Sequence, residues 1–184
     1  RAREFAAKHS AAIPYDNFDA MLRDDAVDVV YIASPNALHA EQPVKAARAG
    51  KHVLVEKPLA LDASSAAELV TLADANGVLL AVDHTPVFTG AVRKLRELVS
   101  TGEIGDLRYF DSMRSNLGLV QPDINVLWDL AIHDLSILQF VTEKMPVSVS
   151  ASGIAHSPSI HESTAYLTLF YEDDFIAHVG TSWM

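Results

Sequence analysis

Two short stretches of this sequence bring together side chains that can hold or move a proton. The first is Glu56-Lys57-Pro58, which ends a short apolar run. The second is the pair Asp129 and His133, which lie four residues apart in a mostly apolar segment. A carboxylate beside an imidazole favours the protonated ring and fixes its tautomer, and both effects suit a general acid or base. Lys57, Asp129 and His133 are therefore the candidate catalytic residues.

Lys57 is predicted to lie at the carboxyl end of a buried strand. Residues 52–55 are rich in β-branched and aliphatic side chains and have the length of an interior parallel strand. Pro58 donates no backbone hydrogen bond and disfavours the α region for Lys57, so the strand ends there. Because side chains alternate along a strand, Val55 and Lys57 face away from Glu56. Open α/β sheets bind ligands at this end, and an ordinary strand terminus with two solvated charges is the alternative.

Asp129 and His133 are predicted to share one face of a helix over residues 126–141. At a spacing of four residues, the acid and the imidazole can share a hydrogen bond. The helix is otherwise apolar, and burying ionisable groups there is costly, which favours a functional role. A core histidine that is satisfied by a nearby acid is the alternative reading of the pair.

Strands and helices alternate along the first half of the chain. Such alternation predicts parallel βαβ units in a doubly wound sheet. Parallel strands end at the same edge, so the polar residues that follow them are expected to line one crevice. The expected strands are 27–33, 52–55 and 78–82, the helices are 38–49 and 62–74, and the strand ends lie at Ser34-Pro35-Asn36, Lys57 and Asp83.

His39 follows the first of these strand ends. It could help to shape the site, or it could be an ordinary residue at the start of a helix. The sequence leaves both readings open.

The second half of the chain has a different pattern, with alternating apolar and polar residues that indicate antiparallel strands. The fold class is therefore α/β: a partial Rossmann doubly wound parallel sheet, then an α+β domain with a mostly antiparallel sheet. We place the two domains at residues 1–87 and 88–184. The expected elements are a helix over 91–98, a strand over 107–113, the helix over 126–141, and strands over 147–155, 162–171 and 175–182.

A polar group near residue 114 offers donors and acceptors that suit a hydroxyl-rich ligand. Arg114 and Asn116 are its candidate substrate-binding residues, together with Asp129 and His133. A solvated loop without a function is the alternative reading of Arg114 and Asn116.

Composition narrows the range of partners. The chain has 184 residues, with 14 basic against 24 acidic residues and a formal charge of -10, which disfavours nucleic acid and anionic membranes. There is no cysteine, so disulfides and thiolate metal sites are excluded and a reducing compartment is permitted. No apolar run reaches transmembrane length, and no spacing of histidines indicates a metal. We expect a cytoplasmic protein without a metal site.

Three segments together resemble the Gfo/Idh/MocA oxidoreductases, the family of glucose-fructose oxidoreductase and inositol dehydrogenase. Their order, intervals and structural settings match over nearly the whole chain, which is more specific than any one motif. The segments are Ser34-Pro35-Asn36-Ala37-Leu38-His39, Glu56-Lys57-Pro58 and Asp129-Leu130-Ala131-Ile132-His133.

The resemblance implies a Rossmann domain that binds NAD or NADP, and a second domain whose large sheet often forms the oligomer interface. It implies that Lys57 orients and polarises the reacting hydroxyl, that His133 takes or returns its proton, and that Asp129 helps to hold substrate and imidazole. It also suggests a cis Lys57–Pro58 bond. The residues implied for the cofactor pocket are Ser34, Pro35, Asn36, His39, Glu56, Lys57 and Pro58.

Two features of the family have no match in this sequence: the glycine-rich first turn and the residue that selects NAD or NADP. We expect both to lie before Arg1, and we expect the second domain to continue beyond Met184.

The sequence thus predicts an NAD(P)-dependent dehydrogenase that acts on CH–OH groups of a sugar, a cyclitol or a nucleotide sugar. One alternative is an NAD-dependent glycoside hydrolase of the same family, whose redox steps cancel. Another is a non-catalytic protein that binds sugars or nucleotides. The expected partners are a sugar-like small molecule and further copies of the chain, as a dimer or tetramer formed through the second-domain sheet.

Overall fold

The computed structural model describes residues 2–10, 13–118, 120–156 and 161–184. The chain divides into two compact units, Arg1–Asp83 and His84–Met184. The sequence places the division four residues later, after residue 87. Residues Thr85–Phe88 form a short 3-10 helix, η2, which makes contacts with helices of the second unit.

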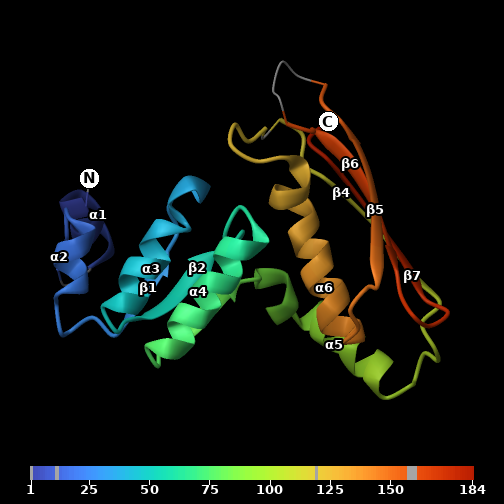
Figure 1. Cartoon of the computed structure of the whole chain (residues 1–184), viewed down its shortest axis with the longest axis horizontal. Helices are drawn as coiled ribbons and strands as arrows, with labels where there is room; N and C mark the ends of the chain where they lie inside the picture. Colours follow the sequence, from blue (N-terminus) through green and yellow to red (C-terminus); the bar gives the residue numbers. More distant parts are fainter. Residues whose placement is uncertain (1, 11–12, 119, 157–160) are drawn as a thin grey trace. The chain divides into compact units, whose positions relative to one another are not determined.

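The first unit has a three-stranded parallel sheet in the order β1-β2-β3 (Figure 1). This arrangement confirms the predicted βαβ units and the Rossmann-like class. The strands are β1 (Val29–Ile32), β2 (His52–Glu56) and β3 (Leu80–Asp83), and the helices are α1 (Ala2–His9), α2 (Phe18–Leu22), η1 (Asn36–Leu38), α3 (Glu41–Arg48) and α4 (Ala63–Ala75).

One face of this sheet forms the core of the first unit. Ile32 is paired with Val55, and Val55 with Val82, across the three strands. Ile32 is 2% exposed and Val55 is fully buried, and the cluster that contains both also includes Ala46 of α3. Because these apolar side chains must remain on the covered face, the register of the strands is strongly specified. The three strands consequently end close to one line.

Helix α4 begins at a side-chain cap, Asp62. The Asp62 carboxylate accepts a hydrogen bond from the backbone N–H of Ser65 at 2.8 Å. Hydrogen bonds from the Ser65 hydroxyl and then from its backbone N–H hold the pKa of Asp62 below its usual value. The helix ends at Asn76-Gly77, where Gly77 adopts a positive φ of 63° that other residues rarely take.

The second unit has a four-stranded sheet in the order β4-β7-β6-β5, with a long helical stretch against it. The predicted antiparallel pairings are confirmed for β5 with β6 and β6 with β7, whereas β4 pairs with β7 in parallel. The elements are α5 (Gly90–Ser100), β4 (Tyr109–Ser115), η3 (Leu127–Ala131), α6 (Ile132–Thr142), β5 (Ser148–Ile154), β6 (Thr164–Phe170) and β7 (Ile176–Ser182).

The inner face of this sheet packs against α6. Leu138 of α6 is 2% exposed and belongs to one cluster with Leu167 of β6 and Val179 of β7. Side chains on β6 alternate between buried and more exposed, as the sequence pattern predicts, whereas β7 alternates only in its first half and is buried from Val179 to Ser182. The predicted helix over 126–141 is divided: η3 is a π-helix and α6 is an α-helix.

Within the described ranges, no helix has the length and apolar character needed to cross a membrane. The same ranges contain no group of three histidine or acidic side chains placed to hold a metal ion.

Two leucines of the first unit test how its core is stabilised. Leu69 of α4 is 2% exposed, whereas Leu79, just before β3, is 72% exposed. We expect Leu69→Ala to lower the free energy of unfolding by about 2–5 kcal/mol because it leaves a cavity. Leu79→Ala should change it by about 0.5 kcal/mol or less. Urea unfolding followed by circular dichroism measures both values, and equal losses would contradict the assigned core.

Candidate functional site

The candidate cofactor residues of the first unit lie at the carboxyl ends of β1 and β2, and His39 joins the two ends. Its Nδ1 atom lies 2.7 Å from the carbonyl oxygen of Pro58, and its Nε2 atom lies 2.9 Å from the carbonyl oxygen of Ser34. The ring is 1% exposed. The structure therefore brings Ser34, His39 and Pro58 together, and His39 is covered by the turns that it connects.

The turn after β1 is held by its own hydrogen bonds. The Ser34 hydroxyl donates to Oε1 of Gln42 at 2.8 Å. Pro35 precedes the short helix η1, and the backbone N–H of Leu38 donates to its carbonyl at 2.9 Å. Asn36 is the first residue of η1, so Ser34, Pro35 and Asn36 form one compact turn at this edge.

The turn after β2 carries Lys57. The Lys57–Pro58 peptide bond is cis, which confirms the expectation from the sequence. Lys57 is partly exposed, whereas Pro58 is almost fully buried. The lysine thus lies at the predicted strand end, next to a buried proline that fixes the path of the chain.

Tyr31 joins the ends of β2 and β3 on the other face of the sheet. Its hydroxyl lies 2.6 Å from Oε1 of Glu56 and 3.1 Å from Oδ2 of Asp83. Glu56 and Asp83 are paired in register, so both carboxylates reach the same hydroxyl. The hydrogen bond to Glu56, then desolvation, then the hydrogen bond to Asp83 raise the pKa of Tyr31 above its usual value. The Tyr31 hydroxyl thus holds the Glu56 carboxylate on the sheet face opposite to Val55.

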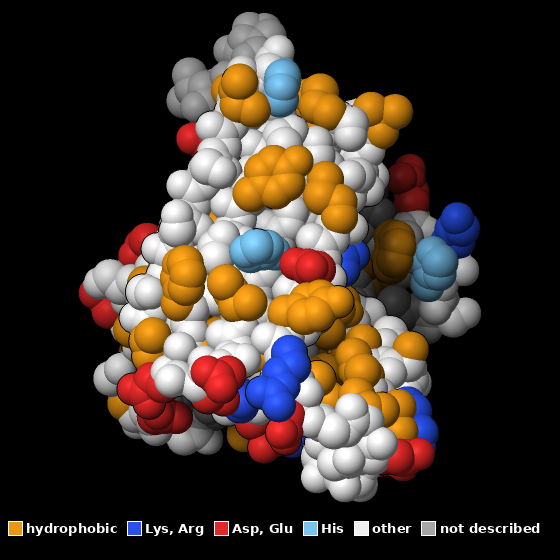
Figure 2. Space-filling model, turned by 90° about the vertical axis from the view of Figure 1, so that its right-hand side faces the viewer, with side chains coloured by type: hydrophobic (Ala, Val, Ile, Leu, Met, Phe, Trp, Pro, Cys, Tyr) orange, Lys and Arg blue, Asp and Glu red, His pale blue; other side chains and the backbone are white. Residues whose placement is uncertain are grey.

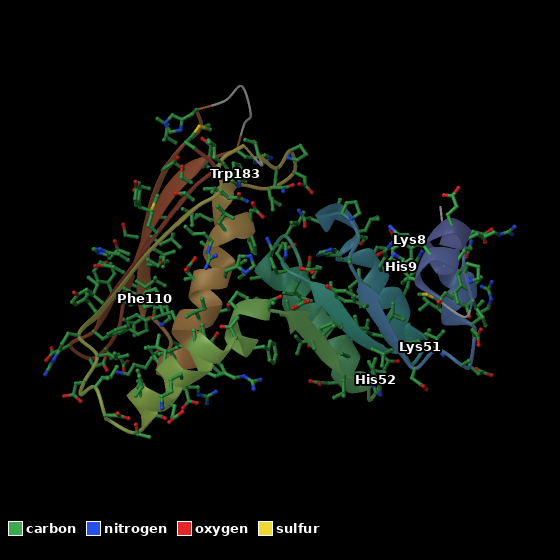
Figure 3. All side chains as sticks on the ribbon, turned by 180° about the vertical axis from the view of Figure 1, so that it is seen from behind. Lys8, His9, Lys51, His52, Phe110 and Trp183 are labelled. Carbon is green, nitrogen blue, oxygen red and sulfur yellow. The ribbon has the colours of Figure 1, made fainter. Side chains whose placement is uncertain are left out.

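Asp129 of the second unit is a buried acid with a fixed partner. It is 8% exposed, and its Oδ2 atom accepts a hydrogen bond of 2.9 Å from Nε1 of the fully buried Trp183. Figure 3 labels the position of Trp183. Asp129 lies in the π-helix η3. Single π-helical turns within α-helices occur frequently at functional sites, because they displace side chains from the regular spacing.

His133 lies in the first turn of α6 and is partly buried. Its carbonyl oxygen accepts a hydrogen bond of 2.7 Å from the Ser136 hydroxyl. The hydrogen bond expected between the side chains of Asp129 and His133 stays a prediction.

Arg114 and Asn116 lie at the end of β4. The Arg114 guanidinium makes a bidentate ion pair with Asp134 of α6, with Nε–Oδ2 at 2.6 Å and Nη2–Oδ1 at 3.1 Å. Asp134 is 6% exposed, so this pair satisfies a buried charge. Asn116 is exposed, and its backbone N–H donates to Ser182 at 2.9 Å.

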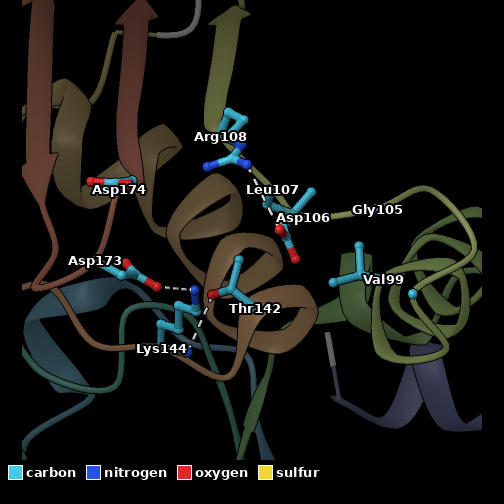
Figure 4. A pocket seen from close by; sticks show the side chains of 10 residues that line it. Val99, Gly105, Asp106, Leu107, Arg108, Thr142, Lys144, Asp173 and Asp174 are labelled. Atoms are coloured by element: carbon cyan, nitrogen blue, oxygen red, sulfur yellow. Dashed lines mark hydrogen bonds and ion pairs between the residues drawn. The ribbon is translucent and has the colours of Figure 1, made fainter.

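Among the hollows of the second unit, two differ in their relation to the candidate residues. One has a volume of about 320 Å³ and is lined by His84, by Val87 of η2 and by residues of α6 on either side of His133 in the sequence, from Ile132 to Phe140. The other has a volume of about 380 Å³ and is shown in Figure 4. In this hollow Lys144 pairs with Asp173 and Arg108 with Asp106, and none of the candidate residues lines it, so we assign it no function.

Three residues of the described structure were missed by the sequence reasoning: Tyr31, Asp134 and Trp183. Tyr31 shares one face of the sheet with Glu56 and Asp83, which can be recognised only once the register of the strands is known. Asp134 directly follows His133, and Trp183 follows the last strand. Their partners come from distant parts of the chain, so no local pattern could reveal them.

The comparisons with known proteins agree with these two units. Residues 1–84 match the family model of the oxidoreductase family with an NAD-binding Rossmann fold, and residues 92–184 match the Gfo/Idh/MocA C-terminal domain. The chain belongs to the Gfo/Idh/MocA oxidoreductase family.

Among similar proteins, a scyllo-inositol 2-dehydrogenase (NADP(+)) of Bacillus subtilis is 36% identical, over 91% of this chain and 55% of its own length. A UDP-N-acetylglucosamine 3-dehydrogenase of Acidithiobacillus ferrooxidans is 35% identical, over 92% of this chain and 52% of its own. An NAD binding oxidoreductase from Klebsiella pneumoniae has a solved structure that superposes with a TM-score of 0.89 at 26% identity, covering 99% of this chain and 55% of its own. The chain spans about half the length of these relatives.

The bond between Trp183 and Asp129 predicts a difference between the two tryptophans of the chain. Trp183→Phe keeps a large ring but removes the donor to a buried carboxylate, so we expect a loss of about 1–3 kcal/mol in the free energy of unfolding. Trp128 is 36% exposed, and Trp128→Phe should cost about 0.5 kcal/mol or less. Denaturant unfolding measures both variants, and equal effects would contradict a structural role for the indole N–H.

Proposed function

We propose that this protein is an NAD(P)-dependent oxidoreductase that transfers a hydride between a nicotinamide cofactor and a secondary alcohol or ketone of a sugar, cyclitol or nucleotide sugar. The observation that carries the proposal is the edge of the first sheet, where His39 bonds to the turns that follow β1 and β2 and Lys57 lies in the second of these turns. Membership of the family over both units supports it. The dehydrogenases among the relatives act on a cyclitol and on a nucleotide sugar, as their names state.

The residues at this edge fit the nicotinamide end of NAD or NADP. The ribose hydroxyls and the carboxamide offer hydrogen-bond donors, and the edge offers carboxylate acceptors at Glu56 and Asp83 together with main-chain groups of the two turns. When bound, the cofactor supplies the hydride acceptor or donor. We assign Ser34, Pro35, Asn36, Glu56, Lys57 and Pro58 to its pocket, with His39 as a support of that pocket.

Lys57, His133 and Asp129 are the proposed catalytic residues. The Lys57 ammonium donates a hydrogen bond to the substrate oxygen and polarises it. His133 removes the hydroxyl proton during oxidation and returns it during reduction. Asp129 holds substrate and imidazole, and its hydrogen bond from Trp183 limits the positions that its carboxylate can adopt. A base that is positioned in this way raises the rate because it stabilises the transition state for proton transfer more than the bound substrate.

Arg114 and Asn116 are the proposed substrate contacts. Arg114 uses its Nε–H and one Nη2–H on Asp134, which leaves further N–H groups of the guanidinium for hydroxyl or carbonyl oxygens. The Asn116 amide can both donate and accept, which suits sugar hydroxyls.

Replacement of His133 tests the catalytic assignment. In the full-length enzyme, His133→Ala should lower turnover about 10²–10⁴-fold, because the positioned base is lost, while the affinity for NAD(P) changes little. The matched control is His9→Ala, because His9 lies on the exposed face of α1. Turnover is followed by the absorbance of the reduced nicotinamide, with cyclitols such as scyllo-inositol and with UDP-N-acetylglucosamine as first substrates.

The same assay separates the alternatives. Net formation of reduced cofactor in proportion to oxidised substrate supports a dehydrogenase. Release of a free sugar without net reduction would identify a glycoside hydrolase, and binding without either reaction would identify a sensor. Turnover like that of the unmodified enzyme in His133→Ala would contradict the role of His133.

We also propose that the protein is a cytoplasmic homo-oligomer, a dimer or tetramer, formed through the outer face of the second-unit sheet. This face carries exposed apolar side chains in neighbouring strands (Figure 2). Met113 and Tyr166 lie on either side of Gly180, and a Cβ atom at Gly180 would meet both side chains. Exposed apolar patches of this kind mark interaction surfaces. Its large apolar members are Tyr109, Met113, Tyr166, Phe170 and Ile176.

A charge on this face tests the assembly. Tyr166 is 55% exposed, and Tyr166→Glu places a carboxylate that would be desolvated in the interface, so we expect dissociation into smaller species. Val70 of α4 is 48% exposed in the first unit, and Val70→Glu should leave the mass unchanged. Sedimentation velocity measures the mass. A Tyr166→Glu protein with the mass of the unmodified assembly would contradict this interface.

A further inference from the structure

His39 is the most completely enclosed ionisable side chain near the strand ends. It is 1% exposed and follows η1 directly, just before α3. A buried imidazole is costly unless its nitrogens are hydrogen-bonded. Both nitrogens have partners, and both partners are backbone carbonyl oxygens: Pro58 at 2.7 Å and Ser34 at 2.9 Å.

These two carbonyls belong to different turns. Ser34 follows β1, and Pro58 follows β2, the neighbouring parallel strand. The ring therefore spans the two turns that contain every residue we assign to the cofactor pocket. Lys57 directly precedes Pro58, so the position of its backbone depends on where the Pro58 carbonyl is held.

The two bonds place a requirement on the ring. A carbonyl oxygen can only accept a hydrogen bond, so each ring nitrogen must donate one. A neutral imidazole carries a single N–H, whereas the doubly protonated ring carries two. Both bonds can thus form together only in the imidazolium form, and bonds from an ionised donor are shorter and stronger than neutral ones.

The charged residues that lie near the bridged positions in the sequence belong to the elements that the ring joins. Glu56 and Lys57 precede Pro58 at the end of β2, and Glu41 begins α3 after His39. The turn from Ala33 to Leu38 contains no charged side chain. Glu56 accepts a hydrogen bond from Tyr31 and Glu41 pairs with Lys45, so the partners that the structure gives to the ring are the two carbonyl oxygens.

We infer that His39 is a positioning residue: an imidazolium that ties the carbonyls of Ser34 and Pro58 together and thereby sets the place of Lys57. The effect on catalysis rests on the proposed function, but the state of the ring does not. His39 does not contact cofactor or substrate, because the ring is enclosed by the turns that it bridges. It acts through the backbone of Lys57.

The state of the ring is measured directly by a neutron crystal structure of the deuterated full-length protein. We expect nuclear density for deuterium on both ring nitrogens of His39, each pointing at its carbonyl oxygen. Deuterium on one nitrogen only would overturn the inference, whatever activity the protein has.

The catalytic consequence is measured with His39→Gln in the same full-length protein. A glutamine amide has a single nitrogen and cannot bridge both carbonyls, so the turns should shift and kcat should fall about tenfold to a hundredfold, as expected for a misplaced catalytic group. His9→Gln is the matched control and should keep full activity. A kcat for His39→Gln equal to that of the control would overturn the positioning role.

The two arms separate failure of this inference from failure of the proposed function. If no hydride transfer is found with the unmodified protein, the proposed function fails while the neutron result still decides the state of His39. If His39→Gln does not fold, a doubly deuterated ring in the unmodified protein supports the clamp, and a singly deuterated ring overturns it.

Discussion

The alignment of three parallel strands in the first unit is the constraint on which the candidate site depends. Ile32, Val55 and Val82 occupy matching positions on one covered face, and a shift by one residue would expose all three. The same register places Glu56 beside Asp83 and puts Lys57 immediately past the strand end. Burial of the apolar face thus determines where the polar groups at the carboxyl ends of the strands lie.

Several candidate side chains are held by partners that come from other elements of the fold. His39 bonds to the carbonyls of Ser34 and Pro58, and Tyr31 bonds to Glu56 and Asp83. In the second unit the pattern is the same, since Trp183 bonds to Asp129 and Arg114 pairs with Asp134. Buried polar groups of this kind are costly when unpaired, so their partners restrict them to few positions. This restriction is what a site needs if its geometry is to be ready before the ligand binds.

Much of the fold could be predicted from the sequence because its signals are local. The run before Pro58 indicates a strand by its β-branched residues, Asp62 indicates a helix start, and the alternation of strands and helices indicates a parallel sheet. The candidate residues of the first unit were found in the same way, since a residue that follows a buried strand must lie at the sheet edge. The cis bond before Pro58 was expected from the family resemblance and is present.

The remaining features depend on long-range pairing, which local pattern does not encode. The parallel contact of β4 with β7 joins residues that lie far apart in the chain, and so does the bond from Trp183 to Asp129. The π-helix at Leu127–Ala131 differs from an α-helix by the position of its hydrogen bonds, not by a distinctive composition. Arg114 is a candidate substrate-binding residue by its place in the sequence, but the buried acid that it pairs with lies on another element. These are tertiary effects, and the structure was needed to find them.

We propose that Lys57 and His133 act in the same catalytic step, one on the substrate oxygen and the other on its proton. A double-mutant cycle on the full-length enzyme tests it most directly, with kcat measured for Lys57→Met, His133→Ala and the double variant. Residues that act as a unit are strongly non-additive, so the double variant should be about as slow as the slower single variant. Single effects that multiply in the double variant would contradict the claim, because they would show that the two side chains contribute independently.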